Sequence, residues 1–176
     1  MIASQAKAEE VVDARELTRR RAWEAAAAVP DPEIPVITVA DLGILRGLRL
    51  DEEGRAVAVI TPTYSGCPAM LLIETEILRA LETAGFPDAR VETVLSPVWT
   101  TDWLSAEGRE KLRAFGIAPP AEASTAKRAL FGETKVACPS CGSGDTERVS
   151  EFGSTPCKAH YRCRACAEPF DYFKCI

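Results

Sequence analysis

The spacing of apolar and polar residues in the first third of the chain predicts one helix followed by a β-hairpin. Good helix formers run from about residue 14 to residue 29, and a proline-rich segment then ends the helix. Two runs with a β-type pattern follow, at 44–50 and 55–64. The loop 51–54 between them contains Gly54, the residue type best suited to a positive φ, so the two runs should pair as a hairpin.

The middle of the chain adds a second helix, a third strand and a third helix. In the sequence SGCPAM, Pro68 suits the first helical position, which makes Cys67 the expected N-cap of a helix that ends at Gly85. The run 89–99 has strand character, and Ser105 is the expected N-cap of a short helix that ends near residue 115. The order α-β-β-α-β-α predicts an α+β fold, in which helices cover a small antiparallel or mixed sheet.

The helix and strand pattern fades after residue 116, which divides the chain into three parts. Residues 117–135 lack an apolar period and are rich in Pro, Ala and Ser, as expected of a linker. The tail, 136–176, is too short to bury a core without a staple, for which a metal ion is the obvious candidate. We therefore expect an α+β domain over 1–116, a linker, and a zinc-ribbon-like β domain over 136–176.

Composition and charge narrow the class of protein. Hydrophobic residues make up 47% of the chain, as in a globular protein. The formal net charge of −5 argues against a general affinity for nucleic acid. The first residues are charged throughout, unlike a secretory signal, and no stretch approaches the roughly 18 apolar residues that a membrane helix needs. We expect a cytoplasmic protein with no membrane or nucleic-acid partner, in which cysteines stay reduced.

Two CxxC pairs in the tail carry the strongest chemical signal. Cys138 and Cys141 form the first pair, Cys163 and Cys166 the second, and 21 residues separate the pairs. This spacing is close to that of a zinc site, and four thiolates fill tetrahedral zinc with no open position, so the ion would be structural. Iron, mononuclear or as a cluster, uses the same ligands and remains an alternative.

Cys67 lies between a predicted strand and a predicted helix, and two interpretations of it stay open. As an N-cap, its thiol would meet the positive end of the helix dipole, which lowers the pKa and favours the reactive, metal-binding thiolate. Alternatively, it is a buried core cysteine, a common environment for a free thiol.

Acidic residues beside proline and glycine, and the one histidine, have structural interpretations as well. Asp31 and Glu33 in the sequence DPE, and Asp41 in DLG, are typical of Asx turns and caps. His160 lies in a predicted ribbon strand, where a solvent-facing side chain is expected more often than a ligand.

At two places the sequence resembles known families. DPEIPVITVADLGIL followed by TPTYSGCPAM resembles the iron–sulfur cluster assembly domain of SufT-like proteins and of cytosolic Fe–S targeting factors. CPSCGS followed by FGSTPCKAHYRCRACAEPFDYFKC is more particular, and with the first half it resembles the PaaD family, the D component of the bacterial phenylacetyl-CoA epoxidase system.

The resemblance implies a function and a set of partners. Cys67 would be the characteristic cysteine of the assembly domain, with Asp31, Glu33, Asp41 and Thr61 in its motif. The protein would serve the phenylacetyl-CoA 1,2-epoxidase of aerobic phenylacetate catabolism, which has a di-iron hydroxylase and an iron–sulfur flavin reductase. It would help to assemble iron or an Fe–S cluster in one of these partners, holding that cargo transiently.

The residues exclude the main catalytic roles in such a system. A di-iron carboxylate centre draws on paired Glu-x-x-His motifs, whereas this chain has one histidine and no Glu three residues before it. It also lacks a GxGxxG sequence, a Walker A loop and a recognisable nucleophile–base–acid set. An accessory, non-enzymatic role remains, either in maturation or as a bound scaffold component. A zinc-ribbon regulator that binds nucleic acid is a third class, which the acidic charge disfavours.

Cys157 and Cys175 are left over from the four-cysteine site. Folding the ribbon hairpin about residues 164–165 pairs position 157 with about 172, so both cysteines should lie at its far end, as much as roughly 20 Å from the zinc. We expect them, with Cys67, to form a second thiol site for iron or a cluster. The alternative is apolar packing at the end of the ribbon, since a disulfide is disfavoured in the cytoplasm.

Overall fold

The computed structural model describes residues 2–64, 66–120 and 136–174, with side chains from residue 14 onward. Its elements are α1 (Ile2–Ala27), β1 (Leu45–Leu50), β2 (Ala56–Ile60), α2 (Met70–Thr83), β3 (Arg90–Thr93), the 3-10 helix η1 (Thr101–Trp103), α3 (Ala106–Ala114), β4 (Ile117–Ala118), β5 (Thr146–Ser150), β6 (Lys158–Cys163) and β7 (Pro169–Phe173). The first six regular elements follow the predicted α-β-β-α-β-α order, and the α+β class is confirmed.

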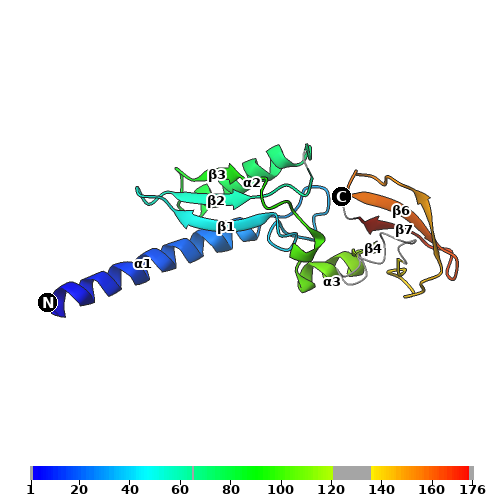
Figure 1. Cartoon of the computed structure of the whole chain (residues 1–176), viewed down its shortest axis with the longest axis horizontal. Coiled ribbons are helices and arrows are strands. Elements are labelled where there is room, and N and C mark those ends of the chain that lie inside the picture. Colours follow the sequence, from blue (N-terminus) through cyan, green and yellow to red (C-terminus); the bar gives the residue numbers. More distant parts are fainter. Residues whose placement is uncertain (1, 65, 121–135, 175–176) are drawn as a thin grey trace.

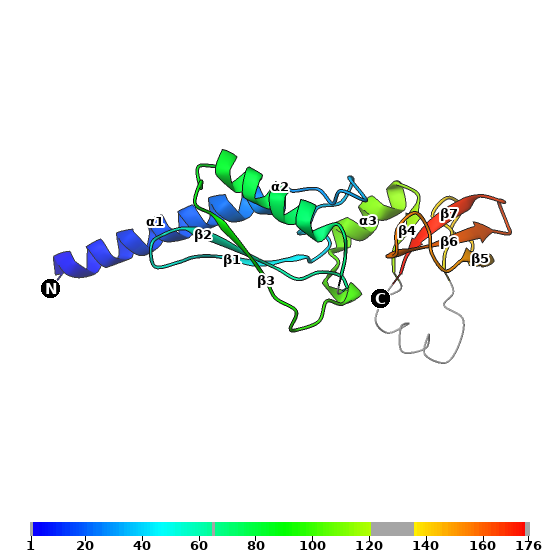
Figure 2. The ribbon, with the colours of Figure 1, turned by 90° about the horizontal axis from the view of Figure 1, so that it is seen from above.

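The first domain is a three-stranded mixed sheet with two helices packed on it. The strand order is β1-β2-β3, with β1 antiparallel and β3 parallel to β2. Figure 2 shows α1 and α2 side by side over the sheet. The apolar stripe of α2, at Ile73, Ile77 and Leu81, is fully buried because its 3.6-residue spacing keeps these side chains on one face.

Several local predictions hold. Gly54 has a φ of +82° in the loop between β1 and β2, which a residue with a Cβ rarely adopts. The Ser105 hydroxyl accepts a hydrogen bond from the backbone N–H of Gly108 at 2.8 Å, so Ser105 is the N-cap of α3. The first helix ends at Ala27, close to the expected position, but begins at Ile2 rather than near residue 14.

Two predictions are wrong near the functional loops. Cys67 is not an N-cap: α2 begins at Met70, Ala69 holds the N-cap position, and the Met70 N–H bonds to the Cys67 carbonyl in a separate turn. The third strand ends at Thr93 rather than continuing to residue 99. Pro97 cannot donate to a ladder, and the N–H of Val94 makes the last bond to β2, at the Ile60 carbonyl.

The ribbon is a four-stranded sheet in the order β4-β7-β6-β5. β4 comes directly after α3, at the start of the segment expected to be a linker, and pairs in parallel with β7. Because this strand continues from the first domain, the backbone itself ties the two sheets together. Most of the expected linker, 121–135, lies outside the described residues.

The pairing of β6 with β7 differs from the expected register by two residues. Lys158 lies opposite Phe173, and the Lys174 N–H bonds to the Cys157 carbonyl at 3.0 Å. The hairpin turn extends as far as Ala167, which has a φ of +63°. Each residue of β6 therefore pairs with a β7 residue two positions further along the chain than a turn at 164–165 would give. Position 157 is therefore opposite 174 instead of 172.

The two domains share a core. Figure 1 shows the ribbon beside α3 and the loops at one end of the first domain. Phe173 from β7 and Ile117 from β4 are buried in the same cluster as the first domain's own core residues. The Arg109 guanidinium on α3 donates to the carbonyls of Thr101 and Pro120, which fixes the chain as it leaves the first domain.

Candidate functional site

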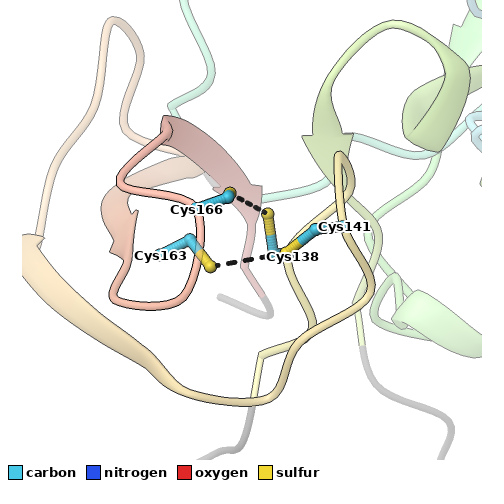
Figure 3. A group of neighbouring side chains, drawn as sticks. All are labelled: Cys138, Cys141, Cys163 and Cys166. Atoms are coloured by element: carbon cyan, nitrogen blue, oxygen red, sulfur yellow. Dashed lines mark hydrogen bonds between the residues drawn. The ribbon is translucent and has the colours of Figure 1, made fainter.

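The four tail cysteines converge on one point, as their spacing predicts. Figure 3 shows the two knuckles facing each other, and the Sγ atoms lie 3.8 Å apart for Cys138–Cys166 and 3.6 Å for Cys141–Cys163. All four ligand atoms lie within 4.8 Å of one another. Tetrahedral zinc with bonds of about 2.3 Å would place its sulfurs about 3.8 Å apart, so the residues fit the ion.

Backbone hydrogen bonds favour the thiolate form of one of these four cysteines, Cys163. The N–H groups of Cys166 and Ala165 donate to the Cys163 sulfur and lower the pKa of that thiol to about 7. Cys138 and Cys163 are buried, whereas Cys141 and Cys166 are exposed. A zinc ion here would have four thiolate ligands and no open position, which makes it a structural centre that holds β5, β6 and β7 together.

Asp31 adopts the Asx turn that the DPE sequence predicts. Its Oδ1 accepts the backbone N–H groups of Glu33 at 2.8 Å and Ile34 at 2.9 Å. The carboxyl is buried, and burial raises its pKa despite these two hydrogen bonds. Glu33 lies on the same turn, and its side chain is exposed.

Asp41 joins two distant parts of the first domain. Its carboxylate accepts hydrogen bonds from Thr38, from the Ser105 hydroxyl at 3.0 Å and from the Lys111 ammonium at 2.8 Å. Burial alone would raise the pKa of Asp41, but the bond from Lys111 and the other donors outweigh it and lower the pKa. Asp41 is therefore a residue that anchors α3 through Ser105 and Lys111, and the N-cap of this helix is Ser105.

Thr61 closes β2 just before the Cys67 loop. Its backbone N–H bonds to the Ile44 carbonyl, while its hydroxyl is buried and has no hydrogen-bond partner within the described part of the chain. Sequence reasoning placed this residue in the assembly-domain motif, and the structure places it at the base of that loop.

Cys67 lies in the loop between β2 and α2, half-buried against the main core. It is neither a helix cap nor a fully buried core residue. The Cys67 N–H bonds back to the Tyr64 carbonyl at 3.3 Å, which closes a turn between the two residues. Tyr64 was missed by sequence reasoning, although its place three residues before Cys67 in a turn could have indicated it.

Cys157 reaches the first domain from the ribbon. It lies just before β6, half-buried, and packs against the core cluster that also contacts Cys67. Burial raises the pKa of its thiol, the Thr155 hydroxyl 3.1 Å away opposes this shift, and the nearby Asp31 carboxylate adds to it. The structure thus places Cys157 of the ribbon against the core of the first domain, and Cys175 lies outside the described residues.

Tyr64 lies within electrostatic reach of both thiols. Burial raises the pKa of its phenol to about 12, with further contributions from Cys67, Cys157 and Glu33.

Lys158, next to Cys157, was also missed by sequence reasoning. Only 6% of this residue is exposed, and its ammonium lies 4.0 Å from the Asp171 carboxylate. A buried lysine beside a thiol has no signature in the sequence, because β strands place lysines on either face.

His160 is on the other side of β6 from the thiols. Its Nδ1 lies 3.3 Å from Asp171 Oδ1, and 42% of its side chain is exposed. It is the solvent-facing strand residue expected from the sequence, and it takes no part in the four-cysteine group.

Comparison with known families covers both halves of the chain. Residues 19–96 match the iron–sulfur cluster assembly protein family, and residues 122–174 match the PaaD zinc beta ribbon domain.

Within the described residues, no helix is long and apolar enough to cross a membrane.

Individual relatives agree with this division. The chain is 49% identical over 154 residues to the D component of 1,2-phenylacetyl-CoA epoxidase from Escherichia coli (strain K12), covering 88% of this chain and 91% of that protein. It is 35% identical over 78 residues to the Fe-S protein maturation auxiliary factor YitW of Bacillus subtilis (strain 168), covering 44% of this chain and 76% of the relative. A crystal structure of a DUF59 domain from Bacillus anthracis superposes with a TM-score of 0.52 at 26% identity, covering 57% of this chain and 96% of that one.

Proposed function

Because the chain belongs to the PaaD family, that of the D component of phenylacetyl-CoA epoxidase, we propose that it is an accessory factor that loads iron or an Fe–S cluster into another component of that epoxidase. The client would be the di-iron hydroxylase or the iron–sulfur flavin reductase. Both the resemblance of the first domain to maturation factors and the family of the whole chain support this role.

One observation supports the proposal: each domain contributes a thiol that packs against the shared core. Cys67 on the β2–α2 loop and Cys157 before β6 pack against the same core, each half-buried. Half-burial suits a thiol that holds a cargo and then releases it, since a fully enclosed site would exchange too slowly. We also assign Cys175 to this second thiol site as a further candidate ligand.

The four-cysteine centre has a different role in the proposal. It shapes the ribbon, and β6 runs directly from Cys163 in that centre to Lys158 beside Cys157. The metal thus holds one end of the strand whose other end presents the cargo thiol. This division assigns structure to Cys138, Cys141, Cys163 and Cys166, and iron handling to Cys67 and Cys157.

A scaffold function is the second candidate, because the Escherichia coli relative is named as a subunit of the epoxidase. A scaffold would stay bound at a fixed stoichiometry, whereas a maturation factor acts in substoichiometric amounts. Co-purification of the chain with the other components therefore separates the two functions.

The test is iron content of the client proteins. The epoxidase components are expressed without this chain, with the wild-type chain and with Cys67→Ser, and iron per hydroxylase and per reductase is measured. We expect iron to fall in one component without the chain and with Cys67→Ser. Full iron occupancy in both components under all three conditions would overturn the maturation role, and stoichiometric co-purification would then favour the scaffold.

A further inference from the structure

The strand β3 forms one edge of the first domain's sheet, and its outer side is open. It pairs with β2 on one side only, and Figure 1 shows it at the margin of the sheet. The Val94 N–H bonds to the Ile60 carbonyl of β2 at 2.8 Å. Because successive residues of a strand turn their backbone groups to opposite sides, those of Val91 and Thr93 point away from β2. Among the described residues, they have no backbone partner.

The β3 edge lacks a feature that protects the other two long edge strands. β1, at the opposite edge of the same sheet, has a bulge between Leu45 and Gly47. β5, at the edge of the ribbon, has one between Arg148 and Ser150. A bulge twists an edge strand and interrupts its row of donors and acceptors, which discourages pairing with another chain. β3 pairs with β2 without a bulge, so its edge is regular enough to accept a further strand.

The side of α2 next to this edge is apolar and exposed. The Thr93 hydroxyl donates to the Glu74 carboxylate at 3.0 Å, which identifies the side of α2 that faces the end of β3. Leu71 and Leu78 lie three residues before and four residues after Glu74, so they share this side of the helix. Leu71 is 76% exposed and Leu78 is 38% exposed. The opposite side of α2, at Ala80, lines a groove against α1.

We propose that the β3 edge and these two leucines are a docking site for an extended peptide segment of an epoxidase component. The segment adds to the sheet as a fourth strand, and its backbone forms hydrogen bonds with Val91 and Thr93. Side chains at alternate positions of the added strand point towards α2 and pack on Leu71 and Leu78. This inference rests on the proposed function, since it takes the partner to be the component that receives iron.

Charges beside the leucines specify the chemistry of the segment. Glu74 and Glu82 lie one turn on either side of Leu78 in α2. Within the described residues neither carboxylate has a Lys or Arg partner, whereas Glu76 pairs with Arg79 at 3.3 Å. A segment with two apolar residues at alternate positions and Lys or Arg beside them complements this pattern. A second copy of this chain does not, because pairing β3 with itself would bring the carboxylates of two α2 helices together.

The docking edge leads to the loop that carries Cys67. β2 and β3 are parallel, and their last residues, Ile60 and Thr93, lie opposite each other. Cys67 lies in the connection between β2 and α2, which starts at that end of the sheet. A segment held beside β3 therefore places its protein at the end of the sheet where the cargo thiol lies.

The proposal is tested by titrating the full-length chain with the purified hydroxylase and, separately, with the purified reductase. One of the two should bind, and in that complex hydrogen exchange at the Val91 and Thr93 amides, measured by NMR, should slow because these groups become hydrogen-bonded. A double variant, Leu71→Lys with Leu78→Lys, should bind about tenfold or more weakly, because it removes both apolar contacts and repels a basic segment.

Leu72→Lys is the matched control. Leu72 is 47% exposed and lies seven residues before Arg79, on the side of α2 that lines the groove against α1, so this variant should bind like the wild type. Cooperative melting confirms that each variant is folded. Wild-type affinity in the double variant, unchanged exchange at Val91 and Thr93 in a complex that forms, or no binding of either component would each overturn the proposal. Slower exchange at higher concentrations of the chain alone would overturn it too, because a second copy would then occupy the edge.

Iron content separates failure of this docking site from failure of the proposed function. A client expressed with the double variant should lose iron, as it should without the chain. If binding and exchange follow the prediction while the client is fully loaded in the absence of the chain, the docking site stands and the maturation role fails. If iron loading requires the chain but is the same with the double variant as with the wild type, the maturation role stands and the docking site is overturned.

Discussion

Trp99 of the first domain packs edge-on against Phe173 at the end of β7, with ring centroids 6.3 Å apart and an interplanar angle of 70°. The indole N–H of Trp99 donates to the Leu42 carbonyl at 2.8 Å, so the ring is also held by a hydrogen bond within the first domain. Both side chains are nearly fully buried. This pair is an apolar contact between the two domains, in the same core against which Cys157 packs.

Removing the Phe173 ring should separate the domains without unfolding either one. Phe173→Ala leaves a cavity against Trp99, and we expect a loss of about 3–5 kcal/mol in the free energy of unfolding. Zinc should remain bound, because the four cysteines lie at the other end of β6 and β7. Denaturant unfolding and zinc analysis check this, with Phe152→Ala as the control, since 61% of Phe152 is exposed. Equal effects of the two variants would contradict the role assigned to the Trp99–Phe173 pair.

Removing one buried thiol should abolish the metal centre. We expect one zinc ion per wild-type chain, and in Cys163→Ser we expect loss of that zinc and of near-ultraviolet circular dichroism from the stacked Tyr161 and Phe170 rings. A strong chelator should have the same effect on the wild type. Cys67→Ser is the control and should keep its zinc. A Cys163→Ser variant that retains one zinc per chain would show that the four-cysteine assignment is wrong.

Asp41 should make the first domain sensitive to acid. The folded-state pKa of Asp41 is below its ordinary value of 3.8, so its carboxylate contributes stability that is fully present above that value and is lost as pH falls through the lower, folded value. Asp41→Asn should cost about 1–3 kcal/mol at neutral pH, because the bonds from Lys111 and Ser105 are weakened.

The measurement is the free energy of unfolding of wild type and Asp41→Asn as a function of pH. The difference between them should shrink once the wild-type carboxylate is protonated. Asp102→Asn alters an exposed carboxylate in η1 and should have little effect at any pH. A constant difference across the acid range would rule out the ionised Asp41 as its source.

Gly43 should not tolerate a side chain. Its φ is +69°, and a Cβ there would lie 2.6 Å from the Cβ and 2.7 Å from the carbonyl oxygen of Trp103. Gly43→Ala should cost about 2–4 kcal/mol, from backbone strain together with displacement of η1. Gly47→Ala in β1 is the matched control, because nothing lies within 4 Å of a Cβ at that position. Thermal melting compares the two, and similar melting temperatures would contradict the predicted clash.

Local patterns in the sequence determined the elements and the metal centre. The apolar period of α2, the Ser105 cap and the turn at Gly54 each depend on neighbours a few residues away, and so they could be predicted. The four-cysteine centre could be predicted as well, because each CxxC knuckle sets the geometry of two ligands locally. Four such thiolates together fill the tetrahedral coordination of one zinc ion. Asp31 formed the turn that the adjacent proline indicates, whereas the bonds of Asp41 to Ser105 and Lys111 depend on tertiary packing.

Tertiary structure alone decided what surrounds Cys67 and Cys157. The sequence predicted Cys67 as a helix cap, but an extra turn before Met70 removes it from the helix end, and the length of such a turn depends on how the loop packs. The register of β6 against β7 shifted by two residues for a similar reason, since the knuckle extends to Ala167. Cys157 of the ribbon packs against the same core as Cys67, which lies 90 positions earlier in the chain. No periodicity encodes such a pairing, because it depends on how the two domains pack against each other.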